Sequence, residues 1–146
     1  PVEYEPVAGQ LHARYANGVK LVMRNDGWIG LGSCPVRFEG EKAWVETGDD
    51  GDVAASSPSL MAGKGAKISG YPANFHVRDF LDCVKSRAQT RANAEAACYS
   101  HIACHAANIA LYLNRKVFYD PVKNEFINDE QANRLRSEAL REPWRI

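Results

Sequence analysis

The sequence predicts an α+β fold: a mostly antiparallel, open-faced sheet with helices packed on one of its faces. Two observations support this prediction. Alternating segments separated by turn residues fill the first part of the chain, and after Pro72 the apolar residues recur with the helical period of about 3.6 residues. Because the strands come first and the helices follow, the class is α+β rather than a regular alternation of parallel strands and helices.

Two β-hairpins are expected before residue 48. Residues 10–25 alternate around Asn17-Gly18, a dipeptide favoured where both residues of a turn adopt positive φ. Residues 35–38 and 43–47 flank Gly40-Glu41 in the same way. Charged and apolar residues interleave in these segments, so together the hairpins predict an antiparallel sheet of at least four strands with one face in water.

Residues 48–72 lose this alternation and are rich in Gly, Ser and Asp. We expect a long excursion over the surface there, with one short strand near Leu60 or Ile68.

Two helices are expected next. Asn74 can cap the first, whose apolar residues recur at i, i+3, i+4 and i+7: Val77, Phe80, Leu81 and Val84. The second is expected from Asn93 to about Leu113. No residue between Glu95 and Arg115 carries a fixed charge, which predicts a helix buried nearly all round. Its serine, histidines and asparagine make it too polar to span a membrane.

The last part of the chain predicts a short strand at 116–119, stopped by Asp120-Pro121, and an amphipathic stretch from about Asp129 to Leu140.

The sheet itself is expected to carry more aromatic residues than one buried face can hold, and an exposed apolar face is typical of an interface. We therefore expect a homo-oligomer formed through the sheet. The aromatic residues in question are Tyr15, Trp28, Phe38 and Trp44.

Composition excludes two classes of partner. The chain of 146 residues has 18 Lys+Arg and 18 Asp+Glu, hence no net charge. It therefore lacks the basic surface that nucleic acid requires and the polybasic segment that membranes attract, and we expect neither as a partner. The chain begins at Pro1 without a leader, so we expect one domain, 1–146, excised from a longer protein. Its compartment stays open: the cytoplasm is favoured, and export is possible if a leader precedes it.

Familiar motifs are incomplete in this chain. Residues 30–35 (GLGSCP) begin like a dinucleotide fingerprint, but Pro35 replaces the third glycine and a strand is expected to follow, so no helix N-terminus would meet a pyrophosphate. Residues 50–52 (DGD) lack the spaced oxygen ligands of a calcium loop. The four cysteines form no CxxC pair and are expected to be free thiols. No nucleophile–base pair is evident, so we expect no catalytic residue in this chain. Because the glycine motif is incomplete, we expect no cofactor-binding residue either.

The histidines offer three interpretations. His101 and His105 share a helix face with Asn108, so they could bind a metal, form a wall that faces a ligand, or lie in an internal hydrogen-bonded seam. Metalloprotease chemistry is excluded because Ile102 stands where the HExxH motif has Glu. We expect no metal and favour the seam, in which case His105→Ala would destabilise the domain. His101, His105 and Asn108 are the candidates for contact with a substrate.

Several segments in order resemble the bacterial branch of the Gfo/Idh/MocA oxidoreductases. The resemblance is carried by residues 15–21 (YANGVKL), 36–44 (VRFEGEKAW), 76–87 (HVRDFLDCVKSR) and 105–110 (HAANIA), then Asp120-Pro121 and Pro143-Trp144. Two departures are modest. Ala43 stands where a glycine is usual before Trp44, and Asn114, where a glycine is also usual, can still adopt the left-handed conformation that ends a helix.

The resemblance implies the C-terminal, substrate-side and oligomerisation domain of an oxidoreductase that acts on a sugar, polyol or related carbinol with NAD or NADP. The N-terminal Rossmann domain, the catalytic lysine and the catalytic histidine of such enzymes would lie outside this chain. We therefore expect the chain alone to be inactive and to need its own Rossmann domain as partner. The alternatives are a non-catalytic binding or assembly module and a domain of a nicotinamide-assisted glycoside hydrolase or lyase.

Overall fold

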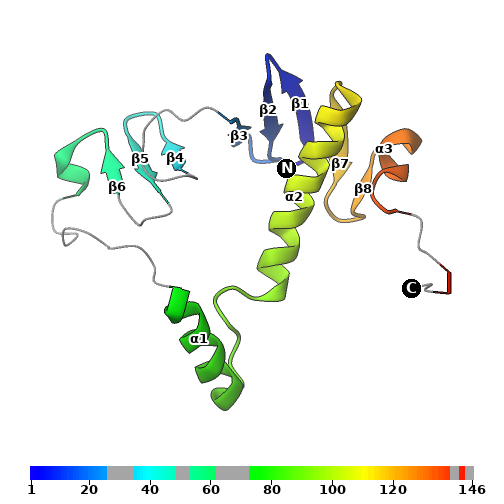
Figure 1. The fold of residues 1–146 in the computed structure, drawn as a ribbon. Coiled ribbons are helices and arrows are strands. Elements are labelled where there is room, and N and C mark those ends of the chain that lie inside the picture. The colour runs from blue at the N-terminus through cyan, green and yellow to red at the C-terminus, as the bar shows by residue number, and fades with distance from the viewer. Residues whose placement is uncertain (26–34, 49–52, 62–72, 139–141, 144–146) are drawn as a thin grey trace. The chain divides into compact units, whose positions relative to one another are not determined.

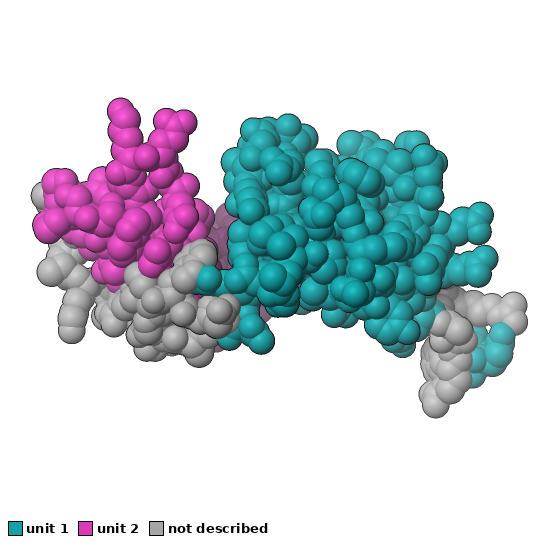
Figure 2. Space-filling view, turned by 90° about the horizontal axis from the view of Figure 1, so that it is seen from above, with its two compact units in different colours: residues 1–25, 94–146 teal, residues 26–93 magenta. Residues whose placement is uncertain are grey.

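The computed structural model describes residues 1–25, 35–48, 53–61, 73–138 and 142–143. The chain groups into two compact units (Figures 1 and 2). Unit 1 comprises residues 1–25 and 94–146, and unit 2 comprises residues 26–93. Unit 1 is therefore built from both ends of the sequence, and the expectation of one domain over 1–146 stays a prediction.

Unit 1 is a five-stranded antiparallel sheet with a long helix packed on one face (Figure 1). Its strand order is β3-β2-β1-β7-β8. This architecture confirms the predicted α+β class. The elements are β1 (Glu3–Val7), β2 (Gln10–Arg14), β3 (Lys20–Met23), α2 (Ala94–Leu113), β7 (Val117–Asp120), β8 (Glu125–Phe126) and α3 (Glu130–Arg134).

The central strand, β1, was not expected from the sequence. It pairs with β2 along its whole length and with β7 through only two residue pairs, Glu3 with Phe118 and Tyr4 with Val117. Pro6 lies beyond those two pairs, where its missing N–H interrupts no pairing with β7. A proline can therefore lie in the middle strand of this sheet because the strand beside it is short.

The turns differ from those expected. Ala8 (φ 48°) and Gly9 (φ 81°), between β1 and β2, both have positive φ, as a two-residue type I′ turn requires. The hairpin around Asn17-Gly18 is confirmed, but only Gly18 has positive φ (88°). The Gly18 N–H donates to the carbonyl oxygen of Tyr15 (2.9 Å), which makes a three-residue loop. Positive φ at Asn17 was a wrong expectation, and its side chain accepts from the N–H of Val19 at 3.1 Å.

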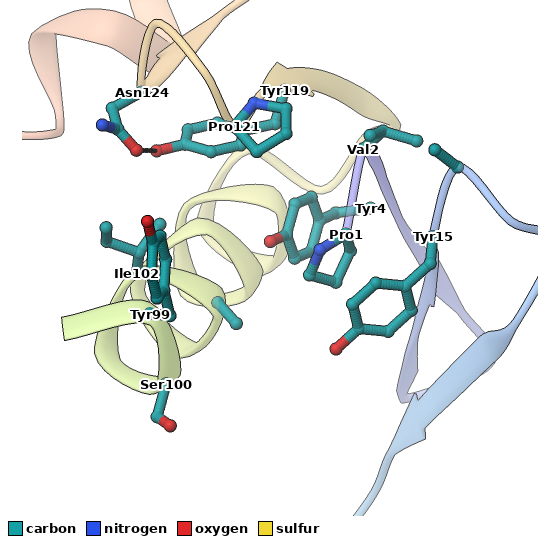
Figure 3. A pocket seen from close by; sticks show the side chains of 12 residues that line it. Pro1, Val2, Tyr4, Tyr15, Tyr99, Ser100, Ile102, Tyr119, Pro121 and Asn124 are labelled. Carbon is teal, nitrogen blue, oxygen red and sulfur yellow. Dashed lines mark hydrogen bonds between the residues drawn. The ribbon is translucent and has the colours of Figure 1, made fainter. Parts of the chain in front are cut away.

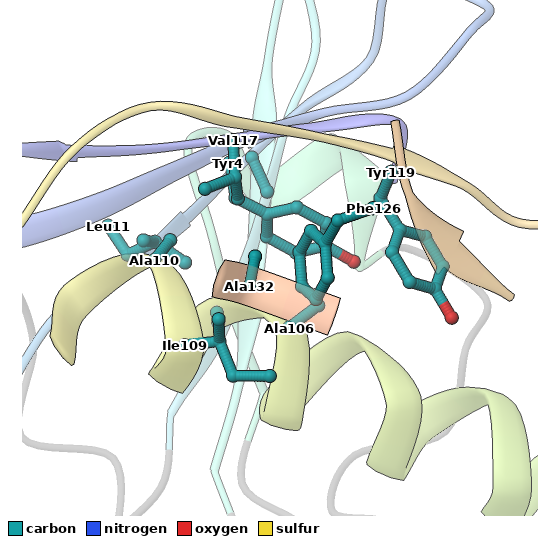
Figure 4. Close-up of a cluster of buried hydrophobic side chains, with 11 residues drawn as sticks. Tyr4, Leu11, Ala106, Ile109, Ala110, Val117, Tyr119, Phe126 and Ala132 are labelled. Atoms are coloured by element: carbon teal, nitrogen blue, oxygen red, sulfur yellow. The ribbon is translucent and has the colours of Figure 1, made fainter. Parts of the chain in front are cut away.

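The core of unit 1 lies between α2 and the sheet (Figure 4). The helix buries a narrow stripe, Ala106, Ala107, Ile109 and Ala110. Alanine at three of these positions lets the backbone of the helix approach the strands closely. The stripe packs among buried side chains from the strands and α3, namely Tyr4, Leu11, Ala13, Val117, Tyr119, Phe126 and Ala132.

The expectation that α2 is buried nearly all round is wrong for the described structure. Leu111 is 45 % exposed and Tyr112 is 77 % exposed. The sequence shows only that this helix carries no fixed charge between Glu95 and Arg115. Histidine, asparagine and tyrosine can face water without a charge, so the absence of charge does not require burial.

The opposite face of the five-stranded sheet carries charges rather than the expected aromatic residues. Lys116 Nζ lies 3.0 Å from Glu3 Oε1 and 3.0 Å from Glu5 Oε2. Arg14 and Lys20, which pair across β2 and β3, add positive charge on the same face because they alternate with the buried residues. The predicted aromatic residues lie elsewhere: Tyr15 follows β2, Phe38 and Trp44 belong to unit 2, and Trp28 lies outside the described residues.

Side chains connect the end of α2 to α3. Asn114 (φ 50°) ends α2 in the left-handed conformation, as expected. Arg115 then binds both carboxylate oxygens of Asp129, at 2.5 and 2.9 Å. Asp129 also caps α3, because its Oδ1 accepts from the N–H of Ala132 at 3.0 Å. The helix that follows, Glu130–Arg134, is shorter than the stretch to Leu140 that the sequence predicted.

Unit 2 contains a three-stranded antiparallel sheet, β4-β5-β6, and the helix α1. The second hairpin is confirmed, but the two hairpins lie in separate sheets, so the expected sheet that joined them is wrong. The alternation of side chains within a hairpin specifies how its two strands pair. It does not specify which strand lies next to the hairpin in the sheet. The elements are β4 (Val36–Glu39), β5 (Trp44–Thr47), β6 (Val53–Ala55), the 3₁₀ helix Pro58–Leu60 and α1 (Ala73–Ser86).

Two smaller expectations in unit 2 are wrong, and a third concerns a residue outside the described ranges. Leu60 ends a 3₁₀ helix rather than lying in a strand, and Ile68 lies outside the described residues. Helix α1 already begins at Ala73, so Asn74 lies inside its first turn and is not its N-cap.

Among the described helices, none has the length and apolar character needed to cross a membrane.

The Arg115–Asp129 pair predicts a pH-dependent contribution to stability. The hydrogen bond from Arg115 holds the pKa of Asp129 below its ordinary value of 3.8, and the N–H of Ala132 acts in the same direction. Since the folded pKa is depressed, this contribution is present above pH about 4 and is lost as the pH falls through the folded pKa. Loss of the cap alone should make Asp129→Ala less stable at pH 7 by about 1–2 kcal/mol.

Urea unfolding of the wild type and of Asp129→Ala at pH 7, 5 and 3 tests this prediction. The difference in unfolding free energy should shrink at pH 3. Glu130→Ala is the matched control, because the Glu130 side chain is 91 % exposed and its pair with Arg134 lies on the surface. A difference for Asp129→Ala that is the same at pH 7 and pH 3 would contradict the assignment.

Candidate functional site

A pocket of about 440 Å³ lies within unit 1 and is the candidate functional site (Figure 3). Its walls come from the start of the chain and β1, the loop after β2, the first half of α2, and the end of β7 with the turn that follows it. Four tyrosines, one from each of these regions, line it: Tyr4, Tyr15, Tyr99 and Tyr119. A volume of this size is typical of small-molecule sites, for which about 300 Å³ is the lower limit.

The two inner tyrosines are held by the core. Tyr4 is 1 % exposed and Tyr119 is 5 % exposed. Their rings meet edge to face, with centroids 6.3 Å apart and planes at 86°, and Tyr119 makes a similar contact with Phe126 at 5.2 Å. Edge-to-face contacts are favourable between aromatic rings, so both side chains have fixed positions.

The turn between β7 and β8 places polar atoms at the pocket. The hydroxyl of Tyr119 donates to Oδ1 of Asn124 at 3.4 Å (Figure 3). Asp120 Oδ1 accepts from the N–H groups of Val122 (2.9 Å) and Lys123 (3.1 Å), which fixes the turn. The guanidinium of Arg136 donates to the carbonyl oxygen of Asn124 and so is engaged by the backbone of the turn.

The hydroxyl of Tyr4 forms no hydrogen bond with any described residue. Burial raises the pKa of Tyr4 well above its ordinary value of 10.0, and the neighbouring Tyr119 and Tyr15 raise it further. Burial is also the main cause of a raised pKa at Tyr119. Both hydroxyls are therefore protonated at neutral pH. They can donate and accept hydrogen bonds, but they do not supply the anionic base that proton abstraction would need.

The structure does not bring the three predicted candidates to this pocket. His101, His105 and Asn108 are exposed on α2, whereas Tyr99, Ser100, Ile102 and Ala103 of the same helix line the pocket. The rings of His101 and His105 stack on each other, with centroids 6.2 Å apart. The expected internal seam is wrong because these side chains are exposed and make no hydrogen bonds to the described residues. Contact with a substrate stays a prediction.

Within the described ranges, no group of three or more His, Cys, Asp or Glu side chains could hold a metal ion. Cys83, Cys98 and Cys104 are free thiols as expected, and Cys34 lies outside the described residues. The acidic turn at 50–52 and most of the glycine motif at 30–35 lie outside them as well. The element that follows the glycine motif is the strand β4, as predicted.

Sequence reasoning missed the tyrosine pocket. Its four tyrosines lie at positions 4, 15, 99 and 119, too far apart for any local motif. Only the pairing of β1 with β7, and the packing of α2 on both, brings them together. The one local signal was that tyrosines in strands can pack edge to face with other aromatic rings. Such packing is not specific to a functional site.

Because His105 is exposed, the destabilisation that the sequence predicted for His105→Ala is no longer expected. We now expect His105→Ala to change the free energy of unfolding by less than about 0.5 kcal/mol, as is usual for surface substitutions. Thermal unfolding followed by circular dichroism measures this. Ala110→Leu is a contrasting variant because Ala110 is 0 % exposed and a larger side chain there must displace the sheet. A fall of several degrees in the Tm of His105→Ala would show that the histidine has buried partners after all.

Comparison with known proteins gives a match to a family model. The family model for the Gfo/Idh/MocA oxidoreductases, described as the oxidoreductase family C-terminal α/β domain, matches residues 8–146. No curated protein and no solved structure gives a match. The matched range includes both hairpins, both long helices and the β7–β8 turn that the sequence resemblance relied on. The chain belongs to the oxidoreductase family whose C-terminal α/β domain this model describes.

Proposed function

We propose that this chain is the substrate-side and oligomerisation domain of an NAD- or NADP-dependent oxidoreductase that acts on a sugar, a polyol or a related carbinol. The match to an oxidoreductase C-terminal domain over residues 8–146 is the observation that carries this proposal. The tyrosine pocket agrees with it, because the raised pKa values of Tyr4 and Tyr119 keep their two hydroxyls neutral, able to bind a ligand but not to remove a proton. The cofactor would supply the hydride chemistry.

The described residues do not fit a nicotinamide cofactor. A dinucleotide site needs a strand, a glycine-rich turn and a helix whose N-terminus faces the pyrophosphate. In this chain the glycine motif leads to strand β4, and the 3₁₀ helix that follows β6 has only three residues. Cofactor binding is therefore assigned to a Rossmann domain outside this chain, and no step of the reaction is assigned to the residues described here.

Self-association through the sheet is the second part of the proposal. The open face of the five-stranded sheet carries acidic residues on β1, Glu3 and Glu5, and basic residues on β2 and β3, Arg14 and Lys20. A surface with both signs of charge can pair with a copy of itself about a twofold axis, each acidic strand facing a basic one. Phe118, which is 50 % exposed on the same face, adds apolar area.

Cofactor binding can be tested directly on the isolated chain. Titration calorimetry with NADH and with NADPH should give no saturable heat up to millimolar cofactor, because the required strand–turn–helix unit lies elsewhere. The longer protein should reduce a nicotinamide in the presence of a polyol. Saturable micromolar binding to the isolated chain would overturn the assignment. Cofactor retained by the longer protein without net turnover of added nicotinamide would favour the hydrolase or lyase alternative.

Association can be tested by sedimentation equilibrium. The chain should form a dimer or larger species at micromolar concentration, and added salt should weaken it because charges on the sheet contribute. Lys20→Glu should weaken association, since it reverses one charge on the open face. Lys85→Glu, on α1 of unit 2, is a control that changes net charge equally. A monomer at all concentrations, or equal effects of the two variants, would count against the sheet as the interface.

A further inference from the structure

The outer edge of β8 is closed by a side chain rather than by a strand. In the described part of the chain, β8 is the last strand of the five-stranded sheet, and it pairs with β7 on its inner side. The N–H of Ile127 donates toward β7, to the carbonyl oxygen of Phe118 at 2.9 Å. Because the backbone groups of successive residues in a strand point to opposite edges, the N–H and C=O of Phe126 point away from β7.

The side-chain amide of Asn133 binds both of these outward groups. The N–H of Phe126 donates to Asn133 Oδ1 at 2.8 Å, and Asn133 Nδ2 donates to the carbonyl oxygen of Phe126 at 2.7 Å. In an antiparallel sheet, a residue of the neighbouring strand makes the same two hydrogen bonds with its own C=O and N–H. One primary amide therefore takes the place that another strand would occupy.

The position of Asn133 is set by the residues around it. Ala132, which precedes it on α3, is 0 % exposed in the core, and Asp129 caps the helix. Just after the helix, the guanidinium of Arg136 donates to the carbonyl oxygen of Asn124, which lies directly before β8. Two side chains of one short segment thus bind the backbone at the outer edge of β8.

We propose that Asn133 guards this edge: with its amide in place, β8 cannot pair with a strand of a second copy of the chain. An open strand edge carries unpaired N–H and C=O groups, which favour edge-to-edge association. Phe126 is 2 % exposed, so without Asn133 its two backbone groups would be buried and unpaired. A second copy is the replacement that we expect, because two β8 edges can pair antiparallel about a twofold axis and each supplies what the other lacks.

This edge association differs from the association through the open face of the sheet that is proposed above. Charged residues on that face make the face association sensitive to salt, whereas hydrogen bonds between backbone edges involve no net charge. Measurements at high salt therefore report on the edge, and their outcome does not depend on the oxidoreductase assignment.

Hydrogen exchange tests whether Asn133 holds the backbone of Phe126. Mass spectrometry would follow peptides that contain Phe126, at low protein concentration and high salt. The amide should be protected in the wild type, and Asn133→Ala should speed its exchange roughly tenfold, as for loss of a hydrogen bond. Arg134→Ala is the matched control on the same helix and should change nothing, because its side chain is 81 % exposed. An unprotected Phe126 amide in the wild type would overturn the proposal.

Sedimentation velocity at high salt tests the guard role itself. Asn133→Ala and Asn133→Leu should form larger species whose share grows with concentration, whereas Arg134→Ala should match the wild type. Asn133→Leu keeps a branched side chain but no hydrogen-bonding atom, so it separates the hydrogen bonds from packing.

Circular dichroism then shows whether the Asn133 variants are folded. Each should fold with a Tm several degrees lower. Folded variants that associate no more than Arg134→Ala would refute the guard role. Variants that do not fold would refute it as well, because Asn133 would then be required for the whole fold and not for its edge.

Discussion

The close contact between α2 and the sheet is the constraint on which unit 1 depends. Alanine at positions 106, 107 and 110 brings the helix backbone near the strands, and larger side chains from β1, β2, β7 and β8 fill the remaining space. The buried stripe is narrow, so the position of the helix is set by only a few side chains. The same contact creates the pocket, because residues from the first half of α2 line it together with Tyr4 and Tyr119.

Local patterns were sufficient to predict the elements that depend on local physics. The hairpins at Asn17-Gly18 and Gly40-Glu41, helix α2 and the left-handed Asn114 all follow from residues within a few positions of each other. Strand β1 could not be predicted in this way, because Pro6 and the turn at Ala8 resemble a loop in the sequence. Its place at the centre of the sheet is decided by β2 and by β7, which lies more than a hundred residues away.

The candidate site was predicted less well than the fold. The histidine face was singled out because uncharged residues recurred at helical spacing, but that pattern cannot say which side of a helix meets the sheet. The alanines decide it, since only small side chains permit close packing, and they place His101 and His105 on the exposed side. The tyrosines carry no signal until the sheet is assembled, because their positions share no motif. Family resemblance, which sums weak matches over the whole chain, succeeded where single motifs did not.

Because unit 1 takes its strands from both ends of the sequence, the order of synthesis matters. The Lys116–Glu3 bond joins residues 113 positions apart, and unit 2 is made in between. On a ribosome, β1 to β3 emerge early as a hairpin pair whose apolar face has no helix to cover it. Until α2 and β7 follow, that face is exposed to chaperones and to other nascent chains. The pairing of β1 with β7 also closes a long loop, which slows folding relative to a helical domain of equal size. In this family member, the apolar face of β1 to β3 therefore stays without its helix for as long as unit 2 is being translated.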